Sequence, residues 1–341
     1  MKRPRILTLI GTLSGLGGLA LLVHLFSGTG VLDQLRALPA VLLLMIPLLA
    51  GAHALKTLSW LRSFPAQPGS RKPPFAPAFT IRLVGEAVNG ALLSAQVAGE
   101  FVKGLLATRY GTRPAAGLAS GFLGKTTFTV GEMLFLLGSA GTALALFGGR
   151  APLVGLLFTI VIGGLIFSGL VIFVQQRRLV GRGARILQAL RLGPRKLWNR
   201  ALPGADAIDA SIRSYYRDQR RDFTFSVAWA TAGWFFGAVE LWLFLHLVIP
   251  VEHPLAVALV LEGGIAVVKG LSFFIPASIG VQEGGIAWLF EATGLPREMG
   301  LTYAVFRRFR ELFWIGIGFL TLWWHLRRNG EAGKKNQEEE K

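Results

Sequence analysis

The sequence lacks cysteine altogether, and only 16% of its 341 residues are charged, against about a quarter in an ordinary soluble domain. Without cysteine there can be no disulfide framework, thiolate metal site or cysteine nucleophile. The five histidines have no metal-ligand spacing, and neither a phosphate-binding Walker loop nor a nucleophile elbow occurs. A nucleotide-driven pump and a hydrolase are therefore disfavoured, and we expect no metal, no other cofactor and no enzymatic activity.

Hydrophobic residues make up 52% of the chain and gather in long runs. About 20 apolar residues suffice to cross a hydrocarbon core of roughly 30 Å. Runs of at least that length occur at 6–31, 39–61, 116–148, 151–175, 223–249 and 302–325. The sequence thus predicts an all-α integral membrane protein, a polytopic helical bundle with one transmembrane domain over 1–326. The run at 6–31 is expected to be a retained helix, and 327–341 a disordered cytoplasmic tail.

The formal charge of +17 is unevenly distributed along the chain. Basic residues gather at 2–5, 62–82, 109–113, 177–221 and 327–335, and the short connections between these groups hold few. This is the positive-inside pattern, which places the basic segments and both termini on the cytoplasmic side. The charge is therefore a topology signal and not a sign of nucleic-acid binding, and the basic face is expected to contact anionic lipid.

Two segments are predicted to enter the membrane and return. Segment 80–112 starts and ends on the cytoplasmic side yet is largely apolar, which favours a re-entrant hairpin; one amphipathic helix in the interface is the alternative. Segment 255–294 is predicted to form a second hairpin from the opposite side, although two full spans also fit the charges. The basic connection 177–222 is expected to be a solvated linker with amphipathic helices at 182–192 and 205–220.

The two predicted hairpins resemble each other at an offset of 183 residues. Aligning 94–125 with 277–308 pairs Glu100 with Glu283, and Lys125 with Arg308. Because the hairpins would enter from opposite sides, the alignment predicts an inverted repeat with halves at about 1–175 and 223–326, as is common in transporters.

Ionisable side chains are numerous in the predicted membrane segments, where each is costly unless it faces a cavity or a partner. At about 1.5 Å per residue, Lys125 and Arg308 each lie roughly 16 Å from the start of their helices, near the midplane. Such cations could hold a phosphate or another anionic headgroup; the alternative is buried ion pairs that only tie helices together. The candidate residues are Glu86, Glu100, Lys103, Lys125, Glu132, Glu240, Glu262, Lys269, Glu283, Arg307, Arg308, Arg310 and Glu311.

Two stretches of the chain are similar to a known family. VNGALLSAQVAGEFVKGLLATRYG (88–111) and FFIPASIGVQEGGIAWLFEATGLPREMGLTYAVFRRFREL (273–312) resemble the flippase-like transmembrane domain of lysylphosphatidylglycerol synthases, and the stretch 273–312 is most similar to hopanoid-biosynthesis-associated membrane proteins. The resemblance implies a lipid-handling protein of the bacterial inner membrane, without the aminoacyl-transfer domain of the synthases. The motif positions that it carries over are Asn89, Glu100, Pro276, Gly280, Gln282, Glu283, Arg308 and Glu311.

The expected function is that of a secondary lipid transporter or flippase, with a hopanoid, an anionic phospholipid or a polyprenyl carrier as candidate substrate. Proton coupling through Glu100, Glu240 or Glu283 would fit. One rival is a non-transporting scaffold that recruits lipid-biosynthesis enzymes through the basic connection 177–222. A membrane-embedded lipid-modifying enzyme is a second rival, for which the sequence offers no convincing reactive constellation.

Overall fold

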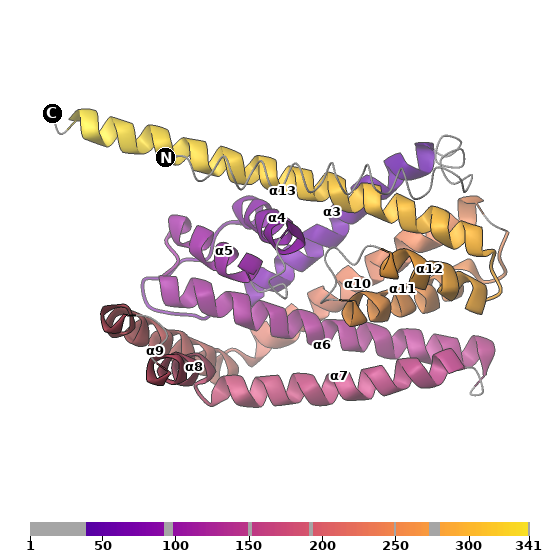
Figure 1. Ribbon diagram of the computed structural model, residues 1–341, viewed down its shortest axis with the longest axis horizontal. Helices are drawn as coiled ribbons and strands as arrows, with labels where there is room; N and C mark the ends of the chain where they lie inside the picture. Colours follow the sequence, from indigo (N-terminus) through magenta and orange to yellow (C-terminus); the bar gives the residue numbers. More distant parts are fainter. Residues whose placement is uncertain are drawn as a thin grey trace. The chain divides into compact units, whose positions relative to one another are not determined.

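The computed structural model describes residues 39–91, 98–148, 152–190, 194–248, 250–272 and 280–339, and every regular element within these ranges is a helix (Figure 1). The helices are α3 (Pro39–Arg62), α4 (Phe75–Ala91), α5 (Ala98–Ala107), α6 (Pro114–Phe147), α7 (Pro152–Gln176), α8 (Leu179–Ala189), α9 (Arg195–Asp218), α10 (Arg220–Val248), α11 (Pro254–Leu271), α12 (Val281–Ala292) and α13 (Arg297–Glu339), with a short 3-10 turn at Thr108–Tyr110. The all-α prediction is confirmed.

Five described segments are long and apolar enough to cross a membrane: Leu43–Arg62, Pro114–Phe147, Val154–Gln176, Arg220–Val248 and Pro254–Leu271. The first four match predicted runs. The run at 6–31 lies outside the described residues, and the run at 302–325 lies within α13. The fifth segment is α11, whose 18 residues rise about 27 Å, whereas the 12 residues of α12 rise only about 18 Å. The segment 255–294 is thus one long and one short helix.

The described residues divide into two compact units. The smaller is formed by 39–46, 79–91, 98–99, 268–272 and 280–339, and the larger by 47–78, 100–148, 152–190, 194–248 and 250–267. Each unit takes residues from both predicted repeat halves, so the units do not coincide with the halves at 1–175 and 223–326.

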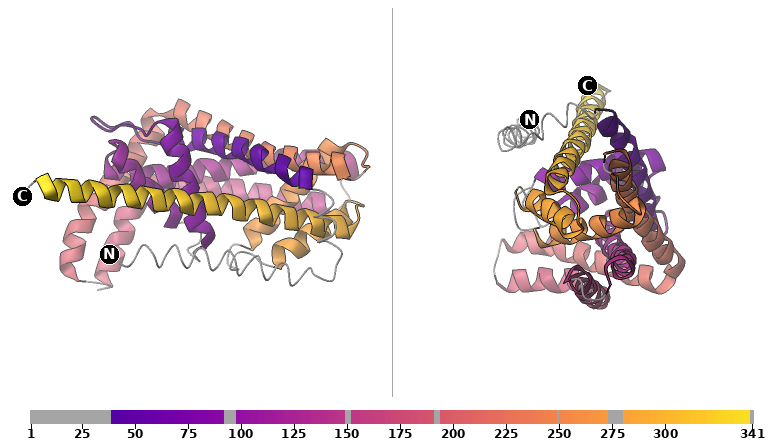
Figure 2. Two further views of the ribbon diagram at one scale, coloured as in Figure 1. Left: turned by 90° about the horizontal axis from the view of Figure 1, so that it is seen from above. Right: turned by 90° about the vertical axis from the view of Figure 1, so that its right-hand side faces the viewer.

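In the larger unit, α6 packs against α7, α9 and α10. Figure 1 shows α6 and α7 side by side. In Figure 2, α8 and α9 form a pair that crosses the direction of α6 and α7. The outer side of α7 carries large apolar side chains that no other part of the unit covers, including Ile162, Ile166 and Phe167, each at least 58% exposed. Such a surface needs a hydrocarbon environment, as expected of a membrane span.

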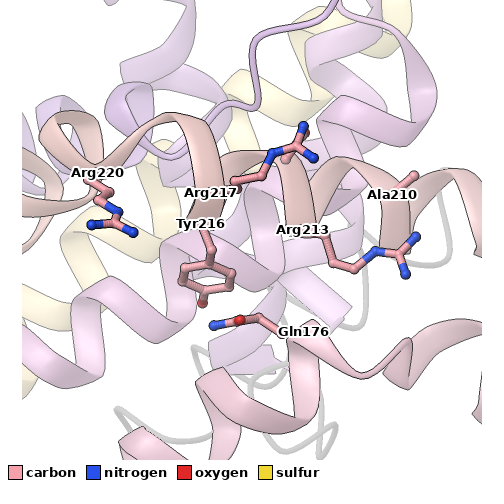
Figure 3. A pocket seen from close by; sticks show the side chains of 7 residues that line it. Gln176, Ala210, Arg213, Tyr216, Arg217 and Arg220 are labelled. Carbon is pink, nitrogen blue, oxygen red and sulfur yellow. The ribbon is translucent and has the colours of Figure 1, made fainter.

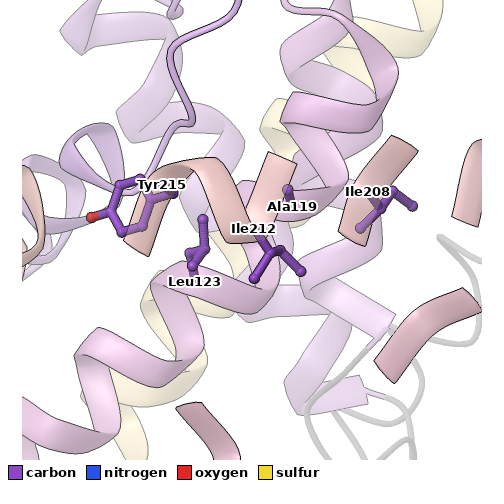
Figure 4. Close-up of a cluster of buried hydrophobic side chains, with 5 residues drawn as sticks. All are labelled: Ala119, Leu123, Ile208, Ile212 and Tyr215. Carbon is purple, nitrogen blue, oxygen red and sulfur yellow. The ribbon is translucent and has the colours of Figure 1, made fainter. Parts of the chain in front are cut away.

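The basic connection is folded and is not the solvated linker that the sequence predicted. Its two amphipathic helices are present as α8 and α9. Ile208, Ile212 and Tyr215 on α9 pack on Ala119 and Leu123 of α6 to form a buried cluster (Figure 4). Burial of this apolar stripe fixes α9 to the bundle, because each fully buried aliphatic side chain contributes roughly 1.5–3 kcal/mol.

In the smaller unit, α12 packs along the first turns of α13. A carbon atom added at Gly300 would lie 2.8 Å from the Ala287 Cα, so the two helices touch through their backbones. Helix α13 continues to Glu339, so 327–339 is helical where a disordered tail was predicted. A helix that is already nucleated extends at little cost through residues such as Glu, Lys and Gln.

The predicted repeat appears in the local structure in the predicted register. Helices α5 and α12 begin 183 residues apart, at Ala98 and Val281, and so do α6 and α13, at Pro114 and Arg297. Between them, Gly111 and Gly294 both take the left-handed conformation, with φ of 84° and 80°, which L side chains rarely adopt. The opposite orientation of the two hairpins in the membrane stays a prediction.

Candidate functional site

The first feature of the site is a carboxylate at the start of α12. Gly280 immediately precedes the helix and has a φ of 82°, and its N–H donates to Glu283 Oε2 at 2.7 Å. An acidic side chain in a first helical turn satisfies a free N–H group and is favoured by the helix dipole. The Glu283 side chain is only 5% exposed, so this carboxylate is buried at the helix start.

Arg308 on α13 holds the same carboxylate from its other side. Its Nε donates to Glu283 Oε1 at 2.6 Å, and one terminal nitrogen donates to Glu311 Oε2 at 3.1 Å. One guanidinium therefore joins α12 to α13 and fixes the Glu311 side chain. Bonds of this charge-assisted kind are the strong ones, and a planar guanidinium can make several at once.

Two further cations lie around Glu311. Arg307 Nε is 3.8 Å and Lys269 Nζ is 3.6 Å from Glu311 Oε1, both longer than the 2.7–2.9 Å of a charge-assisted hydrogen bond. The Lys269 side chain is 42% exposed, whereas that of Arg308 is 11% exposed. Lys269 thus presents an accessible ammonium at the edge of a buried charge network.

We call Lys269, Glu283, Arg307, Arg308 and Glu311 the α12–α13 charge cluster. All five were predicted as site residues, and the structure brings them together within one unit. With three cations and two carboxylates, the cluster has one excess positive charge. An anionic group that binds here would offset this charge and would take the place of the water that the buried cations have lost.

The larger unit holds an ion pair at the equivalent place in the first half. Glu100, in the first turn of α5, lies 2.6 Å from Lys103 Nζ, and Lys103 lies over the Trp60 ring at 5.4 Å from its centroid. Trp60 Nε1 in turn donates to Ser120 Oγ at 3.2 Å. The Lys103 charge is balanced by both a carboxylate and an aromatic face, which stabilises a cation away from water.

Asn89 joins the end of α4 to the start of α5. Its Oδ1 accepts a hydrogen bond of 2.7 Å from the N–H of Gly99. A carbon atom added at Gly99 would lie 2.6 Å from Asn89 Cγ, so only glycine allows this approach. Asn89 therefore has a structural role that is consistent with its place in the motif.

The other predicted residues, except Pro276, lie elsewhere on the described helices. Glu86 is half-exposed and binds Arg82 on its own helix at 2.9 Å. Lys125 and Glu132 lie on α6 and are half-buried, and Glu240 is buried on α10. Gln282 on α12 and Arg310 on α13 are both buried. The Glu262 carboxylate lies against Gly237 of α10. Pro276 lies outside the described residues.

Two features of the larger unit were not predicted from the sequence. Lys56 Nζ lies over both the Phe128 and Trp234 rings, at 5.2 and 5.1 Å from their centroids. The second feature is a group of buried hydroxyls between α3, α6 and α10. In it, Ser226 Oγ donates to Thr127 Oγ1 at 2.8 Å and lies 3.0 Å from Ser63 Oγ. The only sequence signal for this group is the pair Ser59 and Ser63, four residues apart on α3.

Comparison with known proteins gives one family. No curated protein and no solved structure matches the chain. The family model described as the lysylphosphatidylglycerol synthase TM region matches residues 8–318, a range that includes the α12–α13 charge cluster, the Glu100–Lys103 pair and the Asn89–Gly99 hydrogen bond. The chain is therefore a membrane protein that belongs to the lysylphosphatidylglycerol synthase transmembrane-region family.

Proposed function

We propose that this protein is a lipid transporter of the flippase type, which moves a lipid across or out of the bacterial inner membrane. The lipid headgroup would meet the α12–α13 charge cluster, while the acyl or polycyclic part stays in the bilayer. A hopanoid and an anionic phospholipid are the substrate classes that we favour. The termini would lie on the cytoplasmic side, as the basic segments indicate.

The observation that carries this proposal is the position of Lys269 beside the buried Arg308. Arg308 is held by Glu283 and Glu311, whereas the Lys269 ammonium is partly exposed and 3.6 Å from its nearest carboxylate oxygen. A phosphate that reaches Lys269 could therefore form a shorter contact than Glu311 provides. A buried ion pair that only tied helices together would not need this additional exposed cation.

The physical task of such a transporter is to lower the barrier for the headgroup. A charged group at the centre of a bilayer costs at least a few kcal/mol, while the hydrocarbon tails need no aqueous path. Cations and carboxylates that are already fixed by the fold replace the water lost by the headgroup.

The repeat supports two access routes. Glu283 lies in the first turn of α12, and Glu100 lies at the matching position in the first turn of α5. If the two hairpins enter from opposite faces, as in other transporters with inverted repeats, each would line a path to one side. We include this arrangement in the proposal, with re-entrant hairpins at 80–112 and 255–294.

Lipid movement in proteoliposomes tests the proposal. Labelled hopanoid-like, anionic phospholipid and polyprenyl-phosphate probes would be compared for the wild type, Glu283→Gln and the matched control Glu291→Gln. Glu291 is on the same helix, but its ion pair with Arg297 is exposed and 3.6 Å long. Gln at 283 retains an oxygen that can accept from Gly280 N–H and from Arg308, and chemical denaturation in detergent would check that the variant is folded.

We expect movement of one probe class by the wild type and Glu291→Gln, and its loss in Glu283→Gln. Movement that Glu283→Gln leaves intact would contradict a role for the cluster. No movement of any class would favour the non-transporting scaffold, in which lipid-biosynthesis enzymes bind the basic connection.

A further inference from the structure

A second polar site lies away from the α12–α13 charge cluster, within the larger unit. It is a cleft of about 640 Å³ where the end of α7 meets α9 and the start of α10. Its lining includes Gln176, Arg213, Ser214, Tyr216, Arg217 and Arg220. Figure 3 shows Tyr216 and Gln176 facing each other, with Arg213 and Arg220 on either side. Three arginines, Arg213, Arg217 and Arg220, thus line one cleft.

The four carboxylates of the same connection are all engaged, and one of them, Asp218, binds an arginine of the cleft, Arg217. Residues 177–222 contain twelve Arg and Lys but only four Asp. Asp206 binds Arg185, Asp209 accepts from the Val180 and Gly181 N–H groups, Asp218 binds Arg217, and Asp222 binds Arg62. Among the residues that the structure describes, no ion pair neutralises Arg213 or Arg220. The cleft therefore has an excess of positive charge that a bound anion would offset.

The wall of the cleft is fixed by hydrogen bonds to the membrane helices. The Tyr216 hydroxyl donates to Gln175 Oε1 at 2.6 Å, and Gln175 Nε2 donates to Thr126 Oγ1 of α6 at 2.9 Å. The Ser214 hydroxyl donates to the Ser211 carbonyl at 2.9 Å. Because the surrounding side chains are already ordered, an anion would lose less entropy on binding than at a mobile basic surface.

The position of the cleft along the chain indicates the depth of the ligand. Gln176 is the last residue of the span Val154–Gln176, and Arg220 is the first residue of the span Arg220–Val248. The cleft is therefore at the end of two membrane spans, where lipid phosphates lie. Phe173, one turn before Gln176, is 54% exposed and offers an apolar surface to an acyl chain.

We propose that this cleft binds the phosphate of an anionic phospholipid headgroup in the leaflet where α7 ends. Arg213 and Arg220 would bind the phosphate oxygens with their planar guanidinium groups, and the Gln176 amide would donate a further hydrogen bond. The bound lipid would hold the α8–α9 pair at the membrane surface. This site goes beyond the proposed transport function and does not depend on it.

The experiment measures binding of a fluorescent dioctanoyl phosphatidic acid to the purified full chain in detergent. Arg213→Gln/Arg220→Gln removes two charges from the cleft, and Arg182→Gln/Arg221→Gln removes two exposed charges of the same connection outside it. We expect the wild type and this control to bind alike, and the cleft variant to bind about tenfold more weakly or worse, which is ~1.4 kcal/mol. Equal weakening in both double variants, or no binding by the wild type, would overturn the proposal.

Two further arms identify the ligand and guard against misfolding. Inorganic phosphate and glycerol 3-phosphate should not displace the lipid probe at equal concentration, and a phosphatidylcholine probe should bind more weakly. Displacement by the free phosphates would show a site for a soluble ligand and overturn the lipid assignment. If the arginine variant does not fold, Ala210→Glu adds a carboxylate to the cleft without touching an arginine, and Ala207→Glu is its control outside the cleft. Only Ala210→Glu should lose binding; retained binding would contradict the site.

Discussion

Arg308 of α13 donates to Glu283 at the first turn of α12 at 2.6 Å, and the two side chains are 11% and 5% exposed. The same Glu283 accepts the N–H of Gly280, so one carboxylate fixes both a helix start and a helix contact. Arg308 also reaches Glu311, which Lys269 approaches from its exposed side. The network is thus a structural joint between α12 and α13, and in the proposed function it also meets the lipid headgroup.

Replacing Arg308 tests the structural role of this network. Arg308→Lys keeps the charge but cannot donate to Glu283 and Glu311 with the same fork, so we expect a loss of roughly 1.5–3 kcal/mol in unfolding free energy. Arg308→Met leaves two buried carboxylates without this partner and should cost roughly 3–5 kcal/mol. Chemical denaturation in detergent measures both. Arg297→Lys, at an exposed ion pair, should change stability by less than about 0.5 kcal/mol; comparable losses at 297 and 308 would argue against a special role for Arg308.

The backbone contacts between paired helices are a second test of the repeat. A carbon atom added at Gly104 would lie 2.7 Å from the Gly117 carbonyl oxygen, and one added at Gly300 would lie 2.8 Å from the Ala287 Cα. The two contacts are equivalent in the repeat, because Gly117 and Gly300 are 183 residues apart and so are Gly104 and Ala287. Gly104→Ala and Gly300→Ala should each destabilise the protein by roughly 1–3 kcal/mol through overpacking. The thermal midpoint in detergent reports the effect.

Glycines with open surroundings provide the controls. Nothing lies within 4 Å of a carbon atom added at Gly141 of α6 or at Gly316 of α13. Alanine at either place should be neutral or should stabilise the helix by about 0.5–1 kcal/mol. If all four substitutions behaved alike, close helix contact at Gly104 and Gly300 would be refuted.

The helices and the repeat could be predicted from the sequence because both depend on residues that are close together in the chain. Pro114 at a helix start and Gly111 and Gly294 at left-handed positions mark boundaries that depend only on neighbouring residues. The pairing of Glu283 with Arg308 was also accessible, because buried charges of opposite sign need partners.

Packing between distant segments was not accessible in the same way. Ile208, Ile212 and Tyr215 form an apolar stripe on a basic helix, and such a stripe suits a lipid surface as well as the face of α6 that it covers. Lys56 was missed because its partners Phe128 and Trp234 are distant in the sequence. The tail beyond Leu326 was predicted to be disordered from its polar composition, and that composition also favours a helix that continues from α13.

The buried hydroxyl group gives a third prediction. Ser226 Oγ lies within 3.1 Å of oxygens on Ser59, Ser63 and Thr127, and so joins α10 to α3 and α6. Ser226→Ala leaves these partners without a shared hydrogen bond and should lower the unfolding free energy by about 1–3 kcal/mol. Ser168 is the control, since its hydroxyl is buried and, within the described part of the chain, bonds only to the Gly164 carbonyl of its own helix at 2.7 Å. A larger loss in Ser168→Ala than in Ser226→Ala would contradict the joining role.

The tyrosines of α9 give a prediction on pH. Burial raises the pKa of Tyr215 and of Tyr216 well above the ordinary value of about 10, and the nearby Asp222 raises that of Tyr215 further. Because the pKa values of both tyrosines are higher in the folded than in the unfolded protein, the stability that these residues contribute is fully present below about pH 10. This contribution is lost as the pH rises from about 10 through the pKa values of the folded protein. Packing of α9 on α6 should therefore weaken only in strong alkali.

Tyrosinate absorbance near 295 nm tests this directly in detergent. At about pH 10, where an ordinary tyrosine is half-ionised, the wild type and Tyr215→Phe/Tyr216→Phe should give the same absorbance, because neither residue contributes tyrosinate. A difference should appear only at higher pH, together with loss of the folded state in the wild type. If the wild type already shows additional tyrosinate at pH 10, then water reaches α9, and the ordered wall that the phosphate cleft requires is not maintained.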